Sequence, residues 1–155
     1  MKKVLIRDNK VNLVCLAEHC PKNCCGDFML TDNLISFWNI NERLIPLTDE
    51  DYIVFVEKNL SDHLVKELDG GWYIKTDKRG RCPLLEKNKC SIYESRPQCC
   101  RGYPFFFNKY NGLCVHDSCP GWGKGWTEIS VVKEYVACAE KVYRWHMEKT
   151  NRIFD

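Results

Sequence analysis

The clearest apolar pattern in the chain lies near its C-terminus, from Thr127 to about Thr150. Two neighbouring stripes of apolar side chains recur there at the spacing of one helix face. The first stripe consists of Val131, Tyr135, Cys138, Val142 and Trp145, and the second of Val132, Val136, Ala139 and Tyr143. The pattern predicts a long C-terminal helix that packs a broad apolar face on the rest of the protein, with Cys138 as a core thiol.

Two earlier helices are predicted from their start signals. The run from Thr48 to Asp51 reads as a capping box, with Thr48 as N-cap and acidic residues in the first turn. We expect this helix to continue to about Asn59. Thr31-Asp32 can cap another helix, because apolar residues recur behind it at near-helical spacing up to Ile40.

Short apolar runs separated by turn residues predict two β-hairpins and some smaller elements. The hairpins are Val4–Ile6 with Val11–Leu16 around Asp8-Asn9, and Tyr103–Phe107 with Leu113–Val115 around Asn111-Gly112, which would carry Cys114. The smaller elements are a helical piece from Ser61 to Leu68 ended by Gly70-Gly71, a strand at Trp72–Lys75 and a turn at Asp77–Gly80.

The composition fits one folded, soluble unit. At 155 residues, 45% of them hydrophobic, the chain can bury one core, so we expect a single domain over residues 1–155. No run approaches the roughly 18 apolar residues that cross a bilayer. The N-terminus lacks an apolar stretch of the signal-peptide type, so a cytoplasmic location is expected.

Cysteine is the unusual component, with eleven residues in the chain. An odd number and two adjacent pairs, Cys24-Cys25 and Cys99-Cys100, suit metal ligation better than disulfide pairing. On an extended backbone, successive side chains point to opposite sides, so each pair suggests two neighbouring sites, or one ligand plus one packed thiol. The fold class expected is therefore α+β: a small irregular metal-binding domain with short hairpins, cysteine-rich loops and three or four helices.

The stretch from Cys82 to Pro104 is expected to organise the domain. It holds four cysteines with few apolar residues, so we expect a bound metal rather than a side-chain core to fix its shape. Basic residues dominate from Lys75 to Lys109, and they can offset the negative charge of a thiolate site. Arg96 and Arg101, which flank Cys100, are the best candidates for this role.

These motifs resemble the YkgJ-like cysteine-cluster proteins, a family with a zinc- or iron-chelating domain. The resemblance covers about Cys20 to Gly125 and is carried by the motifs C20-x3-C24-C25, C82-P-L-L, C90-S-I-Y-E-S-R-P-x2-C100-R-G-Y-P104 and C119-P-G-W-G. Flagellin lysine methylases carry a similar cysteine module. The resemblance implies that the metal ligands are Cys20, Cys24, Cys25, Cys82, Cys90, Cys100 and Cys119, with Cys114 as an eighth. Cys15 and Cys99 depart from the usual pattern, and a ligand exchange within the Cys99-Cys100 pair stays open.

Eight sulfurs suffice for two four-ligand sites, or for one closed cluster and one site with an open position. We favour an iron-sulfur cluster, of the 4Fe-4S type, with a redox or S-adenosylmethionine-dependent methyl-transfer role. The alternative is a zinc-stapled structural or partner-binding module without catalysis. His19 and His116 adjoin expected ligands and are minor alternatives to a thiolate.

Enzymatic activity is left open by the sequence. It shows no nucleophile–base pair, paired-carboxylate site or nucleotide motif, and the usual radical S-adenosylmethionine motif is absent. The expected partner is a redox or other protein. Net charge is only +2, so nucleic-acid binding through Lys75 to Lys109 is a minor hypothesis, and no membrane partner is expected.

Overall fold

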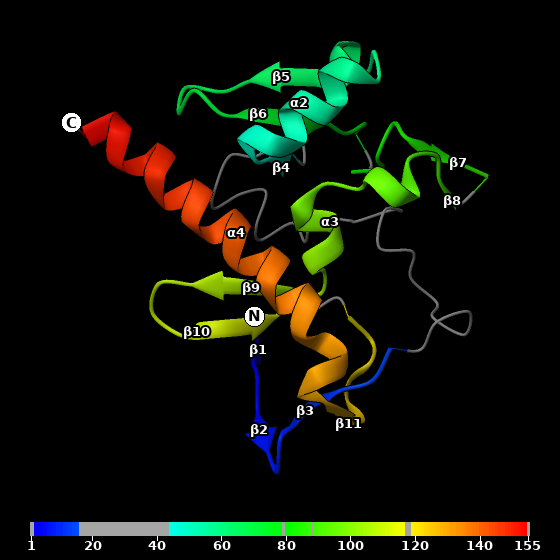
Figure 1. Ribbon diagram of the computed structural model, residues 1–155, viewed down its shortest axis with the longest axis vertical. Helices are drawn as coiled ribbons and strands as arrows, with labels where there is room; N and C mark the ends of the chain where they lie inside the picture. Colours follow the sequence, from blue (N-terminus) through cyan, green and yellow to red (C-terminus); the bar gives the residue numbers. More distant parts are fainter. Residues whose placement is uncertain (1, 16–43, 79, 88, 117–118, 155) are drawn as a thin grey trace.

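The computed structural model describes residues 2–15, 44–78, 80–87, 89–116 and 119–154. It confirms a mixed fold of short hairpins with three α-helices in these ranges, of which the C-terminal one is by far the longest. Figure 1 shows this helix, α4 (Ile129–Phe154), passing alongside two groups of strands. The helix expected at Thr31 to Ile40 lies outside the described residues.

The amino-terminal hairpin is confirmed. β2 (Ile6–Arg7) pairs antiparallel with β3 (Lys10–Leu13), in the register Ile6 to Val11. Asp8 and Asn9 form its turn with φ of 49° and 57°, the left-handed conformation that two-residue hairpin turns of type I′ need. β3 also pairs on its other side with β11 (Trp122–Glu128), a strand that the glycine-rich sequence did not predict.

The second hairpin is also confirmed, and it carries Cys114. β9 (Phe105–Asn108) pairs with β10 (Gly112–Val115), and β1 (Lys2–Lys3) joins the other edge of β10. These strands, β3 and α4 enclose the first core. Its buried residues are Val4, Val11, Leu13, Phe105, Val115, Val132 and Ala139.

A third sheet forms with α2 (Asp49–Glu57) around the second core. Its strand order is β4 (Leu44–Leu47), β6 (Trp72–Lys75) and β5 (Leu64–Lys66), all antiparallel. The capping box of α2 is confirmed, with Thr48 as N-cap and the Asp51 carboxylate accepting a hydrogen bond from the Thr48 backbone N–H. The buried residues of this core are Ile45, Leu47, Phe55, Ile74, Cys82 and Leu84.

The helical piece predicted from Ser61 to Leu68 is wrong beyond its first turn. A 3₁₀ turn covers Ser61–His63, after which Leu64–Lys66 form strand β5 along β6. Pairing with β6 satisfies the backbone of this apolar segment more fully than an isolated short helix would. Gly70, with φ of 76°, therefore serves the β5–β6 turn and does not end a helix.

In its first half the long helix buries the second of its two predicted stripes, whereas in its second half Trp145 of the first stripe is 6% exposed. Val132 and Ala139 are 7% and 4% exposed, whereas Val131 and Tyr135 are 63% and 44% exposed. Cys138, expected as a core thiol, is only half-buried. The helix has rotated toward the stripe that starts with Val132, because α3 (Gln98–Gly102) and β9 both pack on that side.

α4 crosses α3 at very close range. A Cβ atom on Gly102 would lie 2.8 Å from the backbone nitrogen of Ala139, so only glycine fits at this crossing.

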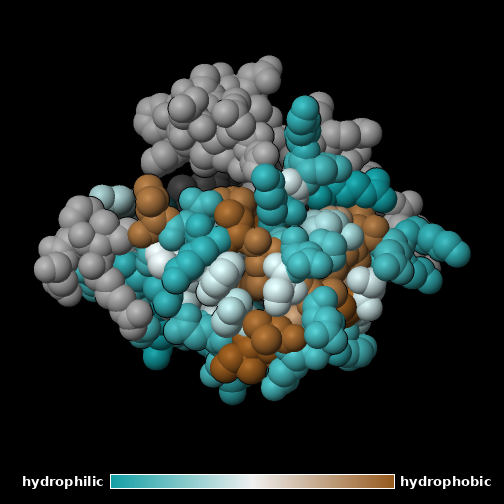
Figure 2. All heavy atoms as spheres, turned by 90° about the horizontal axis from the view of Figure 1, so that it is seen from above, coloured by the Kyte–Doolittle hydropathy of each residue, from teal (hydrophilic) through white to brown (hydrophobic). Residues whose placement is uncertain are grey.

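None of the described helices has the length and apolar character that a membrane span requires. Seen from the end of the molecule where β5, β6 and α2 lie, hydrophobic residues form patches among hydrophilic ones (Figure 2).

Candidate metal centre

Among the described residues, the cysteines other than Cys138 fall on two parts of the fold. One group lies in and beside the second core: Cys82, Cys90, Cys99 and Cys100. The other lies near the first core: Cys15, Cys114 and Cys119. Cys20, Cys24, Cys25 and His19 lie outside the described residues.

Buried apolar side chains hold the stretch from Cys82 to Pro104 in place to a greater extent than the sequence indicated. Cys82 and Leu84 are 8% and 4% exposed and belong to the second core, and Ile92 packs against it. Between them, β7 (Leu85–Glu86) and β8 (Lys89–Cys90) form a small hairpin. The expectation that a metal alone fixes this stretch is therefore wrong, because a few well-spaced apolar residues anchor it to β4, β6 and α2.

Cys99 and Cys100 lie side by side on α3. Their Sγ atoms are 3.8 Å apart, and both side chains pack against the second core. Adjacent side chains point to opposite sides only on an extended backbone. On a helix, successive side chains differ by about 100° in direction, so both sulfurs can face one side of the element. The Cys99 thiol also donates a hydrogen bond to the Pro46 carbonyl of β4, at 3.2 Å.

The buried carboxylate of Asp51 connects α2 to the start of α3. Its Oδ2 accepts hydrogen bonds from the Thr48 backbone N–H and hydroxyl, at 3.1 and 2.8 Å. The Gln98 backbone N–H, immediately before the cysteine pair, donates to both carboxylate oxygens, at 3.2 and 3.1 Å. Burial raises the pKa of Asp51, and the donors at Thr48 and Gln98 act in the opposite direction.

Sequence reasoning placed Asp51 in the capping box but missed its link to α3. The two ends of this link are 47 positions apart along the chain. A capping-box motif indicates only the local hydrogen bonds of its own helix. Nothing in the sequence around Gln98 could have indicated this partner.

Arg101 and Arg96, the residues expected to offset thiolate charge, are both fixed beside the pair. Arg101 donates from Nε to the Arg96 carbonyl at 2.9 Å and from Nη2 to the Glu94 carbonyl at 2.7 Å. The Arg96 guanidinium stacks on Tyr93, with Cζ 3.7 Å from the ring centroid. Two immobilised positive charges thus lie within a few positions of Cys100 in the chain, which suits a negatively charged thiolate site.

The second group of sulfurs lies where β3, β10 and β11 meet. Cys114 is 1% exposed in the middle of β10. The Val14 N–H donates to the Gly121 carbonyl at 3.1 Å, which joins the segments that carry Cys15 and Cys119. Gly121 has no space for a side chain, since a Cβ atom there would lie 1.8 Å from the Val14 carbonyl oxygen. A turn at the C-P-G-W-G motif leads directly into β11.

His116 has an aromatic environment. Its ring stacks on Tyr103, with centroids 5.5 Å apart, and lies 4.5 Å from that of Phe106. Tyr103 and His116 thus support each other at the end of β10, where Cys119 donates its backbone N–H to the His116 carbonyl at 3.0 Å. These contacts hold the loop before β11 and give the two rings a packing role.

No group of three or more metal-ligating side chains is assembled within the ranges that the structure describes. The Cys99-Cys100 pair is nevertheless a fitting half of a tetrahedral site. A thiolate bound to zinc lies about 2.3 Å from the ion, so two sulfurs at tetrahedral angles lie about 3.8 Å apart. The sulfur separation in α3 matches this value.

Comparison with known proteins gives one match. The family model CxxCxxCC, described as "Putative zinc- or iron-chelating domain", matches residues 14–120 and confirms the resemblance drawn from the cysteine motifs. No curated protein and no solved structure matches the chain. The matched segment contains every cysteine except Cys138.

Proposed function

The chain belongs to the CxxCxxCC family of zinc- or iron-chelating domains and is a metal-binding protein, and from this premise we propose that Cys99 and Cys100 bind the same metal atom. The observation that carries the proposal is the 3.8 Å separation of the two sulfurs on α3. That distance is the edge of a tetrahedral thiolate site, about 3.8 Å for a metal–sulfur bond of about 2.3 Å.

The proposed ligand set adds Cys99 to the residues that the family resemblance marks. The Cys99 thiol donates to the Pro46 carbonyl, so metal binding must remove this proton and break the contact. The other two ligands of this site are drawn from Cys82, which packs against the same core, and from Cys20, Cys24 and Cys25. Cys90, Cys114 and Cys119 remain proposed ligands of a second site.

The geometry of the pair supports a single ion, which we take to be zinc. A zinc site closed by four thiolates has no open position and serves as a structural staple. Its formal charge is negative, and Arg96 and Arg101 are fixed nearby in the sequence to offset it. The proposed function is therefore a metal-stapled module that presents its surface to a protein partner.

The iron-sulfur cluster favoured by the sequence remains a prediction. In a 4Fe-4S cluster held by four cysteines, each iron takes one thiolate, so both members of an adjacent pair cannot serve the same iron. Such a cluster would use Cys100 alone and leave the Cys99 thiol on the Pro46 carbonyl. Redox and methyl-transfer roles depend on this cluster.

Three variants of the full chain distinguish the two metal centres: Cys99→Ser, Cys100→Ser and, as a control on α4, Cys138→Ser. The protein is prepared anaerobically, its zinc, iron and acid-labile sulfide are measured, and zinc affinity is measured by chelator competition. A structural zinc site is worth about 10 to 16 kcal/mol, so losing one of four thiolates should weaken binding by about 100-fold or more. We expect this loss for Cys99→Ser and Cys100→Ser alike, and no loss for Cys138→Ser.

Two results would reject the proposal. One is a brown protein containing sulfide, in which Cys100→Ser loses the iron and Cys99→Ser keeps it. That result would establish a cluster with one ligand from the pair. The other is a wild-type protein that takes up neither zinc nor iron when its thiols are fully reduced.

A further inference from the structure

The two helix starts that meet at Asp51 form an unusual junction. Asp51 is the third residue of α2, and the residue is 8% exposed. An ordinary capping-box acid accepts one hydrogen bond, from the backbone N–H of its own N-cap residue. This one also accepts the first N–H of α3, from Gln98, which directly precedes Cys99.

We infer that Asp51 is a positioning residue for the metal ligands Cys99 and Cys100, an inference that rests on the proposed function. The Gln98 N–H cannot take part in hydrogen bonds within α3, because it belongs to the first turn of that helix. Asp51 supplies its acceptor and thereby fixes the start of α3 relative to β4 and α2. The positions of the Cys99 and Cys100 sulfurs, which follow Gln98 in the chain, therefore depend on this hydrogen bond.

A second contact also holds the start of α3. The Cys99 thiol donates to the Pro46 carbonyl of β4. A thiolate has no proton to donate, so this contact is lost when Cys99 binds a metal. The hydrogen bond between Gln98 and Asp51 uses no cysteine atom, and it therefore holds the start of α3 in both states.

Groups that orient a metal ligand have a measurable effect on metal affinity. Removing a group that orients a metal ligand typically costs about 10- to 100-fold in affinity. The stability of α2 and the position of α3 must be separated in the test, because Asp51 serves both. The chain offers variants that do so.

Asp51→Glu is the discriminating change. Glutamate is the usual acid at this position of a capping box, so it can still accept from the Thr48 backbone and stabilise α2. Its extra methylene group moves the carboxylate away from the Gln98 N–H. Asp51→Asn keeps the size of the side chain. It replaces one carboxylate oxygen with an NH2 group, which donates at a position toward which the backbone N–H groups of Thr48 and Gln98 already point.

Asp49→Asn is the matched control. Asp49 lies in the same turn of α2 and the substitution removes the same charge, but its Oδ1 faces Lys149 and Trp145 of α4 and not α3. Zinc dissociation constants are measured for the wild-type chain and the three variants by chelator competition. Thermal unfolding of the metal-free forms is followed in parallel.

We expect Asp51→Glu and Asp51→Asn to weaken zinc binding by about 10- to 100-fold, and Asp49→Asn to stay within about threefold of the wild type. Asp51→Glu should lose affinity even where its melting temperature equals that of Asp49→Asn. Wild-type affinity in Asp51→Glu, or equal losses in all three variants, would overturn the positioning role and leave the metal site intact. Failure of the wild-type chain to bind metal would instead reject the proposed function, and this inference with it.

Discussion

Trp145 of α4 donates its indole N–H to the Asp49 carboxylate of α2, at 3.1 Å. The same oxygen accepts from Lys149, one turn further along α4 and also at 3.1 Å. Trp145 is 6% exposed, and its ring lies against Gly71 and edge-on to Tyr73. The C-terminal half of α4 is therefore fixed to the sheet and helix that surround the second core.

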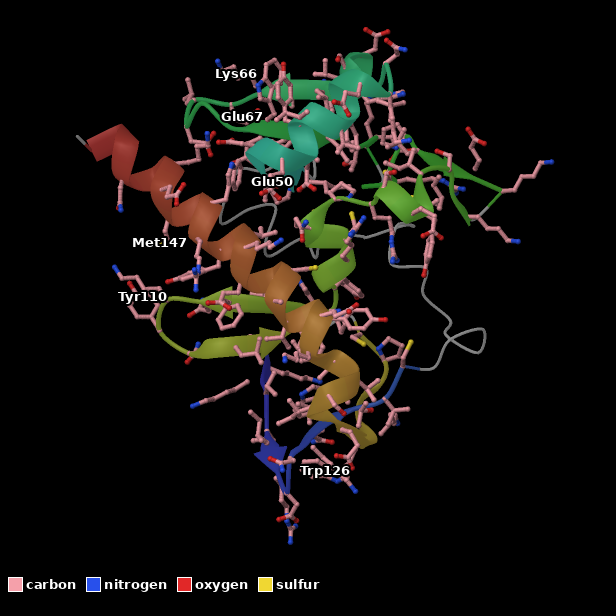
Figure 3. All side chains as sticks on the ribbon, viewed as in Figure 1. Glu50, Lys66, Glu67, Tyr110, Trp126 and Met147 are labelled. Atoms are coloured by element: carbon pink, nitrogen blue, oxygen red, sulfur yellow. The ribbon has the colours of Figure 1, made fainter. Side chains whose placement is uncertain are left out.

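Trp145→Phe should destabilise the protein by about 2 to 4 kcal/mol, because it removes both a hydrogen bond to a carboxylate and part of a buried ring. Unfolding in urea gives the measurement. Trp126→Phe is the control, since Trp126 is 45% exposed and lies at the opposite end of the molecule from Glu50 of α2 (Figure 3). Its effect should stay within about 0.5 kcal/mol. Equal effects of the two changes would contradict a docking role for Trp145.

Gly102→Ala should separate α3 from α4 and destabilise the fold by about 1 to 3 kcal/mol or more. The added Cβ would lie 2.8 Å from a backbone atom, the Ala139 nitrogen, which cannot change rotamer. Ala139→Gly should therefore fail to rescue the variant, although it removes a neighbouring methyl group. Chemical denaturation of the single and double variants tests this, and full rescue would show that side-chain crowding alone forbids alanine.

Tyr73→Phe should cost about 1 to 2 kcal/mol at neutral pH, since the phenol donates to the Asp69 carboxylate. Burial, and then the nearby Asp69 carboxylate, raise the pKa of Tyr73 above its usual value of 10.0. The folded protein thus holds the proton more tightly than the unfolded chain does. This contribution is complete below about pH 10 and is lost as the pH rises through the folded-state pKa. Stability curves for both proteins between pH 8 and 12 would reveal it, and a constant difference would argue against the shift.

Acid titration of protein prepared without metal should reveal how the ionisation of Asp51 changes the stability of the fold. Burial raises the pKa of Asp51 above its ordinary value of 3.8. A raised folded-state pKa stabilises the fold fully below the unfolded value, and this stabilisation is lost as the pH rises through the folded value. Wild-type stability minus that of Asp51→Asn should therefore fall between about pH 3 and neutrality. A difference that grows over this range would mean that the hydrogen bonds to Asp51 outweigh its burial.

Local signals in the sequence predicted the elements that depend on neighbouring residues. Asp8-Asn9 and Asn111-Gly112 supply the backbone conformations of tight turns, and both hairpins exist. Thr48 and Asp51 exchange hydrogen bonds within one helical turn, so α2 begins where its capping box predicts. Each of these elements is fixed by contacts across a few positions of the chain.

Elements that depend on distant partners could not be predicted in the same way. Leu64–Lys66 reads as helical until β6 is beside it, and Trp122–Glu128 reads as a loop until β3 supplies a partner strand. The choice between two stripes of α4 was decided by Gly102, which lets α3 approach one side only.

At the metal centre, the sequence indicated the chemistry better than the geometry. The cysteine motifs led to the zinc- or iron-chelating family that the match to residues 14–120 confirms. The pairing of Cys99 with Cys100 could not be foreseen, because it needs a helical backbone at a place where prolines and turns suggested a loop. The division of ligands between sites remains a prediction.

The close crossing of α3 and α4 bears on how the cysteine motif can be inherited or transplanted. The family match ends at residue 120, yet Ala139 and Trp145 of α4 hold the element that carries the cysteine pair and the sheet beneath it. A graft limited to the matched segment would leave Gly102 facing water and the first hydrophobic core without the helix residues Val132 and Ala139. In this protein, the portable unit is the motif together with its carboxy-terminal helix.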